Sequence, residues 1–542
     1  MSKKTVAFLS AEFGLDNDLP TYSGGLGILA GDIVNAAADL DYPFFGIGIL
    51  YKGKGFMQHI TGGGKEEKRD SEFDHDTSFL RPVLKNGRPL TINLPAITGK
   101  VRAKAYQIRL SDNCIAFFLS TDVDGNPPEW IADMDTLYGG SPESQVRQQI
   151  LLGIGGVKLL DELGIKPDIF HINEGRPCFL IWEVTSNIMR SGNLSFDKAW
   201  SAAKEKVVYT NHTLLAAGNL TYPSDLVSKW AQVFAKEMNL DPLLLIKEGL
   251  SDENTFSITK FAINISKKHS AVSKVHASYA KKDWPEIDFI PITNGVHLGR
   301  WQDSDFRDKS AADDAIWELH MLKKRELQNS VVKRTGVGYD PERLVVTWAR
   351  RLAEYKQPKI IFEDIKRLKQ ILTNREKPAQ LLFAGNTHGD DPNAKSIIEE
   401  IIGLFATELF GHAIFIPNYN ISLANHLTSG SDIWLNTPKG NLEACGTSGM
   451  KALANGVLNM TVLDGWTYEV DWKDIGWVLD PQNVAQSIYK TLEEEVLPLY
   501  YARENGLPTT WIAKMRASIS LAEDFSAERA FKEYIEKLYE SS

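Results

Sequence analysis

Two successive series of short apolar segments, separated by stretches with helical spacing, constrain the fold of this chain more than any other feature. Segments of four to seven residues rich in β-branched and aromatic side chains are typical of buried strands. The first series is Thr5–Leu9, Phe44–Leu50, Ile169–Ile172 and Val207–Thr210. The second series is Leu344–Trp348, Leu381–Ala384, Ile414–Pro417, Ile433–Asn436 and Val457–Leu463. Strands that alternate with helices predict an α/β protein with largely parallel sheets.

The two series predict two Rossmann-like domains. The chain has 542 residues, and a single hydrophobic core stops growing at about 250–300 residues. We expect an N-terminal domain at 1–305, a C-terminal domain at 306–510 and a helix at 511–542 that packs across the domains. Turn residues and alternating segments predict a mostly antiparallel insertion at about 62–135. Helices are predicted at Gln145–Leu163, Trp317–Thr335 and Ser518–Tyr539.

The composition argues against several classes of protein. Sixty Lys and Arg against 70 Asp and Glu give a formal net charge of −10, whereas nucleic-acid-binding proteins usually carry a basic stripe. The three cysteines stand far apart and no His-Glu-x-x-His motif occurs, so we expect neither a disulfide framework nor a metal site. No segment has the length and hydropathy of a membrane span or a signal peptide. We therefore expect a cytoplasmic protein without a nucleic-acid or membrane partner.

Three segments that follow predicted strands carry groups suited to anion binding. The glycine loop, residues 22–32, precedes a helical pattern, and its backbone N–H groups can approach an anion at a helix N-terminus. Arg350, Arg351 and Lys356 place three cations after a strand of the second series, which suits a phosphate pocket. Residues 443–451 end in Lys451, whose amine can form a Schiff base with an aldehyde cofactor. Each segment also has an interpretation without a ligand. The glycine loop can be a ligand-free turn, the segment with Arg350, Arg351 and Lys356 can be a solvated charged turn, and residues 443–451 can be an ordinary capped helix.

A histidine also ends one of the predicted strands. His212 follows Val207–Thr210 and can face a ligand at the carboxyl ends of the strands, where such sheets bind their ligands. The alternative is a structural histidine, which is the commoner role of a lone His.

Together these segments resemble the glycogen and α-glucan phosphorylase family along nearly the whole chain. The glycine loop, His171–Gly175, Thr210–Thr213 and Thr293–Val296 resemble successive family blocks. The most specific block is Glu-Ala-Cys-Gly-Thr-Ser-Gly-Met-Lys at residues 443–451. The resemblance implies a GT-B scaffold, in which two Rossmann-like domains face a central cleft. It also implies retaining phosphorolysis of α-1,4-glucans such as glycogen or maltodextrin, with inorganic phosphate as partner and glucose 1-phosphate as product.

The resemblance further implies a pyridoxal 5′-phosphate cofactor and a role for each matching residue. Lys451 would hold the cofactor, with Arg350, Thr447 and Ser448 around its phosphate and Tyr419 nearby. Inorganic phosphate would be bound by Arg351, Lys356 and the N–H of Gly25. The glucosyl unit would be held by Glu443, Gly446, Tyr355 and His212, with Ser270 touching the sugar. A homodimer is also an expectation.

Four positions depart from the family pattern. They are Arg176 for His, Ser270 for Asn, Gln357 for Arg and Asn386 for Lys. Ser offers fewer hydrogen bonds than Asn, which predicts relaxed selection at C6 of the sugar. Two other functions remain open at this point. One is a nucleotide-sugar glycosyltransferase resembling glycogen synthase, and the other is a non-catalytic protein that binds glucan or sugar phosphate.

Overall fold

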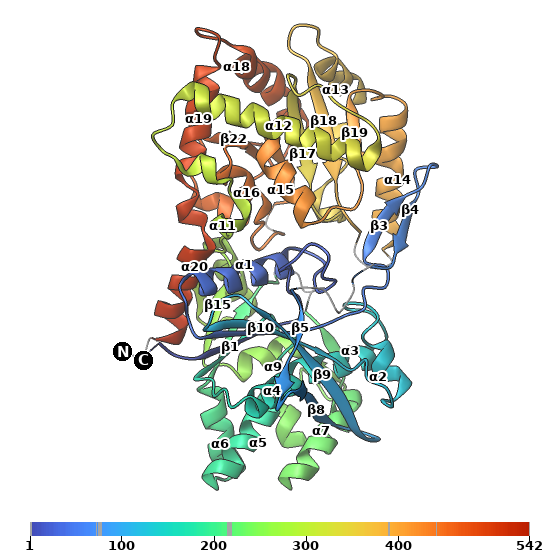
Figure 1. Ribbon diagram of the computed structural model, residues 1–542, viewed down its shortest axis with the longest axis vertical. Helices are drawn as coiled ribbons and strands as arrows, with labels where there is room; N and C mark the ends of the chain where they lie inside the picture. The colour runs from blue at the N-terminus through green and yellow to red at the C-terminus, as the bar shows by residue number, and fades with distance from the viewer. Residues whose placement is uncertain are drawn as a thin grey trace. The chain divides into compact units, whose positions relative to one another are not determined.

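The computed structural model describes residues 3–71, 73, 79–213, 219–387, 391–440 and 442–540 (Figure 1). The chain forms two compact units. Unit 1 comprises residues 1–56, 70–293 and 530–542, and unit 2 comprises 57–69 and 294–529. Each unit contains a sheet with parallel strands, which confirms the predicted mixed α/β class. The division between the units falls at 293/294, residues 511–529 belong to unit 2 and residues 530–542 belong to unit 1.

A ten-stranded sheet forms the centre of unit 1. Its order is β16-β15-β12-β11-β1-β2-β10-β9-β5, and β8 also pairs with β9. Neighbours from β16 to β10 run parallel, while β9 pairs antiparallel with β10, β8 and β5. The parallel strands are β1 (Val6–Ser10), β2 (Phe44–Ile49), β10 (Cys114–Ser120), β11 (Ile169–Asn173), β12 (Val207–Asn211), β15 (Lys268–Ala271) and β16 (Phe289–Pro291). The antiparallel strands are β5 (Arg81–Pro82), β8 (Thr91–Ala96) and β9 (Gly99–Arg109).

Helices pack against the apolar side chains of this sheet. The largest core joins strand residues such as Leu9 and Ile47 to helical residues such as Leu152, Trp182 and Trp230. Helix α20 (Ala527–Tyr534) also packs here, since the ring of Phe531 meets Tyr42 and Phe44 edge to face. The helices of unit 1 include α1 (Gly25–Asp39), α3 (Pro142–Ile150), α4 (Gly156–Glu162), α5 (Leu180–Gly192), α6 (Phe196–Lys204), α7 (Ser224–Met238), α9 (Ile258–Asn264) and α10 (Lys274–Asp283).

Unit 2 is built on a six-stranded parallel sheet of order β19-β18-β17-β20-β21-β22. Its strands are β17 (Leu344–Ala349), β18 (Ala379–Ala384), β19 (Ala413–Ile416), β20 (Ile433–Asn436), β21 (Leu458–Thr461) and β22 (Gly476–Val478). On one face, α12 (Asp313–Thr335) and α15 (Ile421–Gly430) lie side by side and share a core with β17 (Figure 1). On the other face, α13 (Ile365–Leu372), α14 (Pro392–Ala406), α17 (Val484–Thr491) and α19 (Thr509–Ser520) share a second core with the sheet.

Most predicted elements occur, with three differences. The helix expected at Gln145–Leu163 runs from α3 to α4 through a π-helical turn at Leu151–Gly155. The helix expected at Ser518–Tyr539 is interrupted: α19 ends at Ser520, and α20 covers Ala527–Tyr534. A short hairpin of β3 (Met57–Ile60) and β4 (Glu66–Arg69), which falls partly in the expected insertion, belongs to unit 2.

Candidate functional site

Three of the predicted phosphate-binding residues, Arg350, Arg351 and Lys356, lie just after β17, and two of them contact one carboxylate. Arg350 Nη1 lies 3.3 Å from Glu443 Oε2, and Lys356 Nζ lies 3.0 Å from Glu443 Oε1. The Lys356 ammonium also lies 5.3 Å from the centroid of the Tyr355 ring, and Arg351 Nη2 is 3.4 Å from the Tyr355 hydroxyl. The parallel strands β17 and β20 are neighbours, so the loops that follow them meet at one edge of the sheet.

The charges at this edge set the protonation of Glu443. Burial acts to raise the pKa of its carboxyl, but Arg350 and Lys356 outweigh burial and hold the pKa at about 2. Asp464 accepts hydrogen bonds from the backbone N–H groups of Leu442 and Glu443. Burial, together with the charge of Glu443, raises the pKa of Asp464 to about 6. The segment before Gly446 is therefore held by one ionised carboxylate and one that titrates near neutral pH.

The backbone at Gly446 packs closely against the ion pair of Arg350 and Glu443. A Cβ atom there would lie 2.7 Å from Glu443 Oε1 and 3.2 Å from Arg350 Nη2. Arg350 is only 7% exposed, and its Nη1 atom has no hydrogen bond besides the ion pair with Glu443 within the described residues. A side chain at 446 would therefore displace Glu443 or Arg350.

Lys451 lies in α16 (Ser448–Ala454), which begins one residue after Thr447. Its side chain is buried, with 6% of the residue exposed, and its Nζ atom lies 3.4 Å from the centroid of the Trp301 ring. Ser448 faces the sheet, where its hydroxyl accepts a hydrogen bond of 3.2 Å from Trp434 Nε1. A lysine in this position is shielded from solvent, as a lysine that reacts with an aldehyde needs to be.

Trp301 is a site residue that the sequence analysis missed. Asn455 Nδ2 donates to the backbone carbonyls of Trp301, at 2.7 Å, and of Lys451, at 2.9 Å. This buried amide therefore fixes the short helix α11 (Leu298–Trp301) against α16. The sequence offered a signal, because Trp301 closely follows the Thr293–Val296 block.

Tyr419 follows β19 and is tied to a second loop of the same edge. Asn386 Nδ2 donates to Tyr419 O at 2.8 Å, and Asn386 Oδ1 accepts from Tyr419 N at 3.2 Å. The hairpin residue Gln58 bonds to both loops as well, through Gly385 O at 3.0 Å and Asn418 N at 2.9 Å. The amide at 386 thus has a structural use here, and Gln58 is a second residue that the sequence analysis did not assign.

The remaining departure in unit 2 is Gln357. Its backbone is left-handed, with φ of 48°, and its carbonyl accepts from the Thr437 hydroxyl at 3.4 Å. The residue ends the short 3₁₀ helix Glu354–Lys356. Among the described residues of unit 2, no contact assigns a ligand-binding role to its side chain.

In unit 1 the glycine loop leads into α1, and Gly25 is the first residue of that helix. Among the described residues, the N–H groups of Gly25, Leu26 and Gly27 have no hydrogen-bond partner. A Cβ atom at Gly24 or Gly25 would meet nothing within 4 Å. Free donors beside open space at the N-terminus of a 15-residue helix suit an anion.

His212 lies at the end of β12 and is held by the loop after β11. Its Nε2 atom is 2.6 Å from Asn173 Oδ1, and its backbone N–H donates to Glu174 Oε2 at 3.0 Å. Asn173 Nδ2 donates to Ser10 Oγ, so Asn173 Oδ1 is the acceptor and His212 Nε2 carries the proton. Burial, with smaller contributions from His276 and His171, lowers the pKa of His212 to about 3. His212 is therefore neutral, with Nδ1 as an acceptor.

Ser270, another departure from the family pattern, lies inside the sheet of unit 1. It is 0% exposed on β15, and its hydroxyl is 2.7 Å from Thr210 Oγ1. Thr210 Oγ1 lies 2.6 Å from His171 Nε2, and His171 Nδ1 lies 2.7 Å from the Tyr539 hydroxyl. This buried chain connects the sheet to the C-terminal segment of unit 1. The placement argues against a direct contact between the Ser270 side chain and a sugar.

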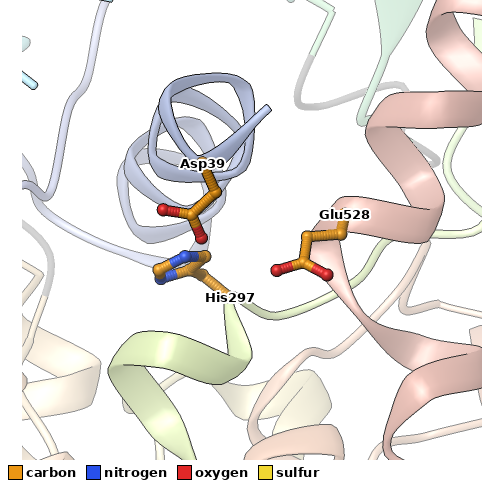
Figure 2. Close-up of side chains that lie close together, drawn as sticks. All are labelled: Asp39, His297 and Glu528. Atoms are coloured by element: carbon orange, nitrogen blue, oxygen red, sulfur yellow. The ribbon is translucent and has the colours of Figure 1, made fainter. Parts of the chain in front are cut away.

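In unit 2, the imidazole of His297 and the carboxylate of Glu528 have donor atoms within 4.8 Å of each other (Figure 2). Within the described ranges, every helix is too short or too polar to cross a bilayer.

Comparison with known proteins identifies the family. The model of the family described as carbohydrate phosphorylase matches residues 299–476. Maltodextrin phosphorylase of Thermococcus litoralis is 34% identical over 99% of this chain and 70% of that protein. Glycogen phosphorylase of Aquifex aeolicus is 34% identical over 99% of this chain and 86% of that protein. An uncharacterized protein of Methanocaldococcus jannaschii is 33% identical over 99% of this chain and 100% of its own length. This chain is therefore a member of the carbohydrate phosphorylase family.

Proposed function

We propose that this protein catalyses the retaining phosphorolysis of α-1,4-glucans such as glycogen or maltodextrin. Inorganic phosphate is the second substrate and α-glucose 1-phosphate the product. The observation that carries the proposal is the convergence of Arg350 and Lys356 on the buried carboxylate of Glu443, at the sheet edge that also bears Lys451. The names of the two phosphorylases from Thermococcus and Aquifex agree with this reaction.

The residues present fit pyridoxal 5′-phosphate. Lys451 is a buried lysine that could react with its aldehyde, Arg350 has a buried donor atom, and the absence of a side chain at Gly446 lets the backbone approach Arg350 closely. Lys451 would hold the cofactor, Arg350, Thr447 and Ser448 would bind its phosphate, and Tyr419 would lie nearby. When bound, the cofactor supplies a phosphate group that can exchange protons with the substrate phosphate. A nucleotide-sugar transferase has no use for a buried lysine of this kind.

The other assigned residues act on the two substrates. Arg351, Lys356 and the Gly25 N–H bind inorganic phosphate, and the cations offset the repulsion between neighbouring phosphate groups. Glu443 and His212 are hydrogen-bond acceptors for sugar hydroxyls, and Tyr355 and Gly446 complete the sugar site. A GT-B arrangement of the two units and a homodimeric assembly belong to the same proposal, and they rest on family membership.

A donor and acceptor panel tests the proposed reaction. Purified protein saturated with pyridoxal phosphate is incubated with maltodextrins of increasing length and phosphate, and the products are identified by NMR. We expect α-glucose 1-phosphate and, in the reverse direction, chain elongation from glucose 1-phosphate. Elongation from ADP-glucose or UDP-glucose alone would support the transferase instead, and binding of glucan without turnover would support the non-catalytic alternative.

A further inference from the structure

Glu12 caps the glycine loop from outside the loop itself. Its Oε2 atom accepts hydrogen bonds from the backbone N–H groups of Ser23, at 2.8 Å, and Gly24, at 3.1 Å. Gly24 is the N-cap of α1 and has no side chain with which to cap the helix. The carboxylate of Glu12, which is 4% exposed, supplies the missing acceptor. Charge-assisted bonds of this kind, at the positive end of a helix, are among the stronger ones in proteins.

A tyrosine in a strained conformation holds the other oxygen of Glu12. The Tyr138 hydroxyl donates to Glu12 Oε1 at 2.6 Å. The backbone of Tyr138 is left-handed, with φ of 61°, a conformation that costs roughly 1–2 kcal/mol for a residue with a Cβ atom. The guanidinium carbon of Arg176 lies 4.2 Å from the centroid of the Tyr138 ring and covers it. Strain of this kind persists where the surrounding contacts over-determine the conformation.

The loop packs closely on Glu12 and is open on its other side. A Cβ atom at Gly27 would lie 2.9 Å from Glu12 Oε2 and 2.6 Å from Tyr22 Cβ. At Gly24 and Gly25, by contrast, an added Cβ would meet nothing within 4 Å. Glu12 thus accepts the hydrogen bonds of the two N–H groups that precede the helix. The N–H groups of the first helical turn do not bond to Glu12 and can bind a ligand.

We propose that Glu12 is a positioning residue: its carboxylate, held by Tyr138 under Arg176, fixes the glycine loop so that the N–H groups of Gly25, Leu26 and Gly27 can bind phosphate. This inference rests on the proposed function for the identity of the anion. It also gives Arg176, one of the four departures from the family pattern, a role as the cover of the Tyr138 ring. Glu12 itself touches neither substrate nor cofactor.

Hydrogen exchange and phosphate kinetics of the full-length protein test this role together. In Glu12→Ala, we expect the Ser23 and Gly24 amides to exchange at least about tenfold faster, since each loses a charge-assisted bond. The KM for inorganic phosphate should rise about tenfold, while the KM for maltodextrin changes less than about twofold. Glu12→Gln, which keeps an acceptor, and Tyr138→Phe, which keeps the ring, should give smaller changes in the same direction.

Glu183→Gln is the matched control. Glu183 is also a buried carboxylate of unit 1, bonded to Lys158 and Arg190, and its loss should leave loop exchange and the phosphate KM unchanged. If Glu12→Ala fails to fold, the loop exchange and the phosphate KM of Glu12→Gln and Tyr138→Phe test the inference instead. Loop exchange within twofold of wild type in these variants, or equal changes in both KM values, would overturn the inference. Absence of phosphorolysis in wild type would overturn the proposed function, while loop exchange would still report whether Glu12 holds the loop.

Discussion

The balance of charge around Glu443 is the residue-scale basis of the proposed phosphate site. Two cations face one carboxylate, and Arg351 adds a third positive charge to the same segment. The carboxylate keeps these cations in place and solvates them in the free protein. A phosphate that binds here meets a positive environment that is already organised.

Lys356→Ala should lower kcat for phosphorolysis by about 10²–10³-fold, the usual cost of removing one preorganised donor. Lys359→Ala is the matched control, because Lys359 lies three residues away and pairs with Glu400 at the surface. Its turnover should equal that of wild type. Steady-state kinetics compares the turnover of the two variants, and circular dichroism checks that both are folded. Near-normal turnover in Lys356→Ala would remove this lysine from the phosphate site.

Asp464 makes stability depend on pH in an unusual direction. Its folded-state pKa of about 6 exceeds the ordinary 3.8, so the folded protein binds the proton more tightly than the unfolded chain. This contribution is complete below about pH 4 and is lost as the pH rises through 6, a change on the order of 2–3 kcal/mol. Melting temperatures from pH 4 to 7 should show this component in wild type and not in Asp464→Asn. Parallel curves for the two proteins would contradict the assignment.

At the scale of elements, a buried ion pair joins α12 to the sheet of unit 2. Lys324 Nζ lies 2.6 Å from Asp432 Oδ2 and 2.7 Å from the Tyr500 hydroxyl, and His320 Nε2 lies 2.7 Å from Asp432 Oδ1. These groups are fully buried. Asp432 directly precedes β20, so the pair fixes the strand that leads to the site.

Lys324→Ala should destabilise unit 2 by about 3–5 kcal/mol, because it leaves a buried charge without its main partner. Lys333→Ala, on the exposed side of the same helix, should change stability by less than about 0.5 kcal/mol. Hydrogen exchange of the β17 and β20 amides measures the effect within unit 2. Equal exchange in both variants would show that the buried pair contributes nothing.

The hydrogen-bonded chain from Ser270 to Tyr539 leads to a revised expectation for the sugar site. Because Ser270 is buried against Thr210, Ser270→Asn should overpack the sheet and destabilise unit 1 by about 1–3 kcal/mol. Discrimination between glucose 1-phosphate and xylose 1-phosphate should stay as in wild type. Stricter selection for glucose in Ser270→Asn, without loss of stability, would restore the direct sugar contact that the sequence suggested.

At the scale of the whole molecule, the sequence predicted the strands better than the contacts. Apolar runs such as Ile433–Asn436 match observed strands because burial on both faces leaves an unambiguous signal. The short strands β15, β16 and β22 were missed, since polar residues interrupt them or they span only three residues. The assignment of the β3–β4 hairpin to unit 2 could not be predicted, because it depends on distant bonds from Gln58.

In the candidate site, too, local motifs could be predicted from the sequence, whereas contacts between distant residues could not. The motif at 443–451 located Glu443, Gly446 and Lys451 from sequence, because their chemistry is local. The sequence analysis did not assign a role to Trp301, Asn455 or Glu12. These residues act through contacts with residues far along the chain, and such contacts leave no periodicity or spacing in the sequence. The contact of Ser270 with Thr210 on the neighbouring strand likewise leaves no pattern in the sequence.

Borohydride reduction followed by peptide mass mapping tests the central claim most directly. Purified protein loaded with pyridoxal phosphate is reduced, digested and compared with a Lys451→Arg variant treated in the same way. We expect a phosphopyridoxyl group on Lys451 in wild type, no adduct in the variant, and loss of maltodextrin phosphorolysis with it. A wild-type protein that forms glucose 1-phosphate while Lys451 stays unmodified, or that carries the adduct on another lysine, would contradict the account.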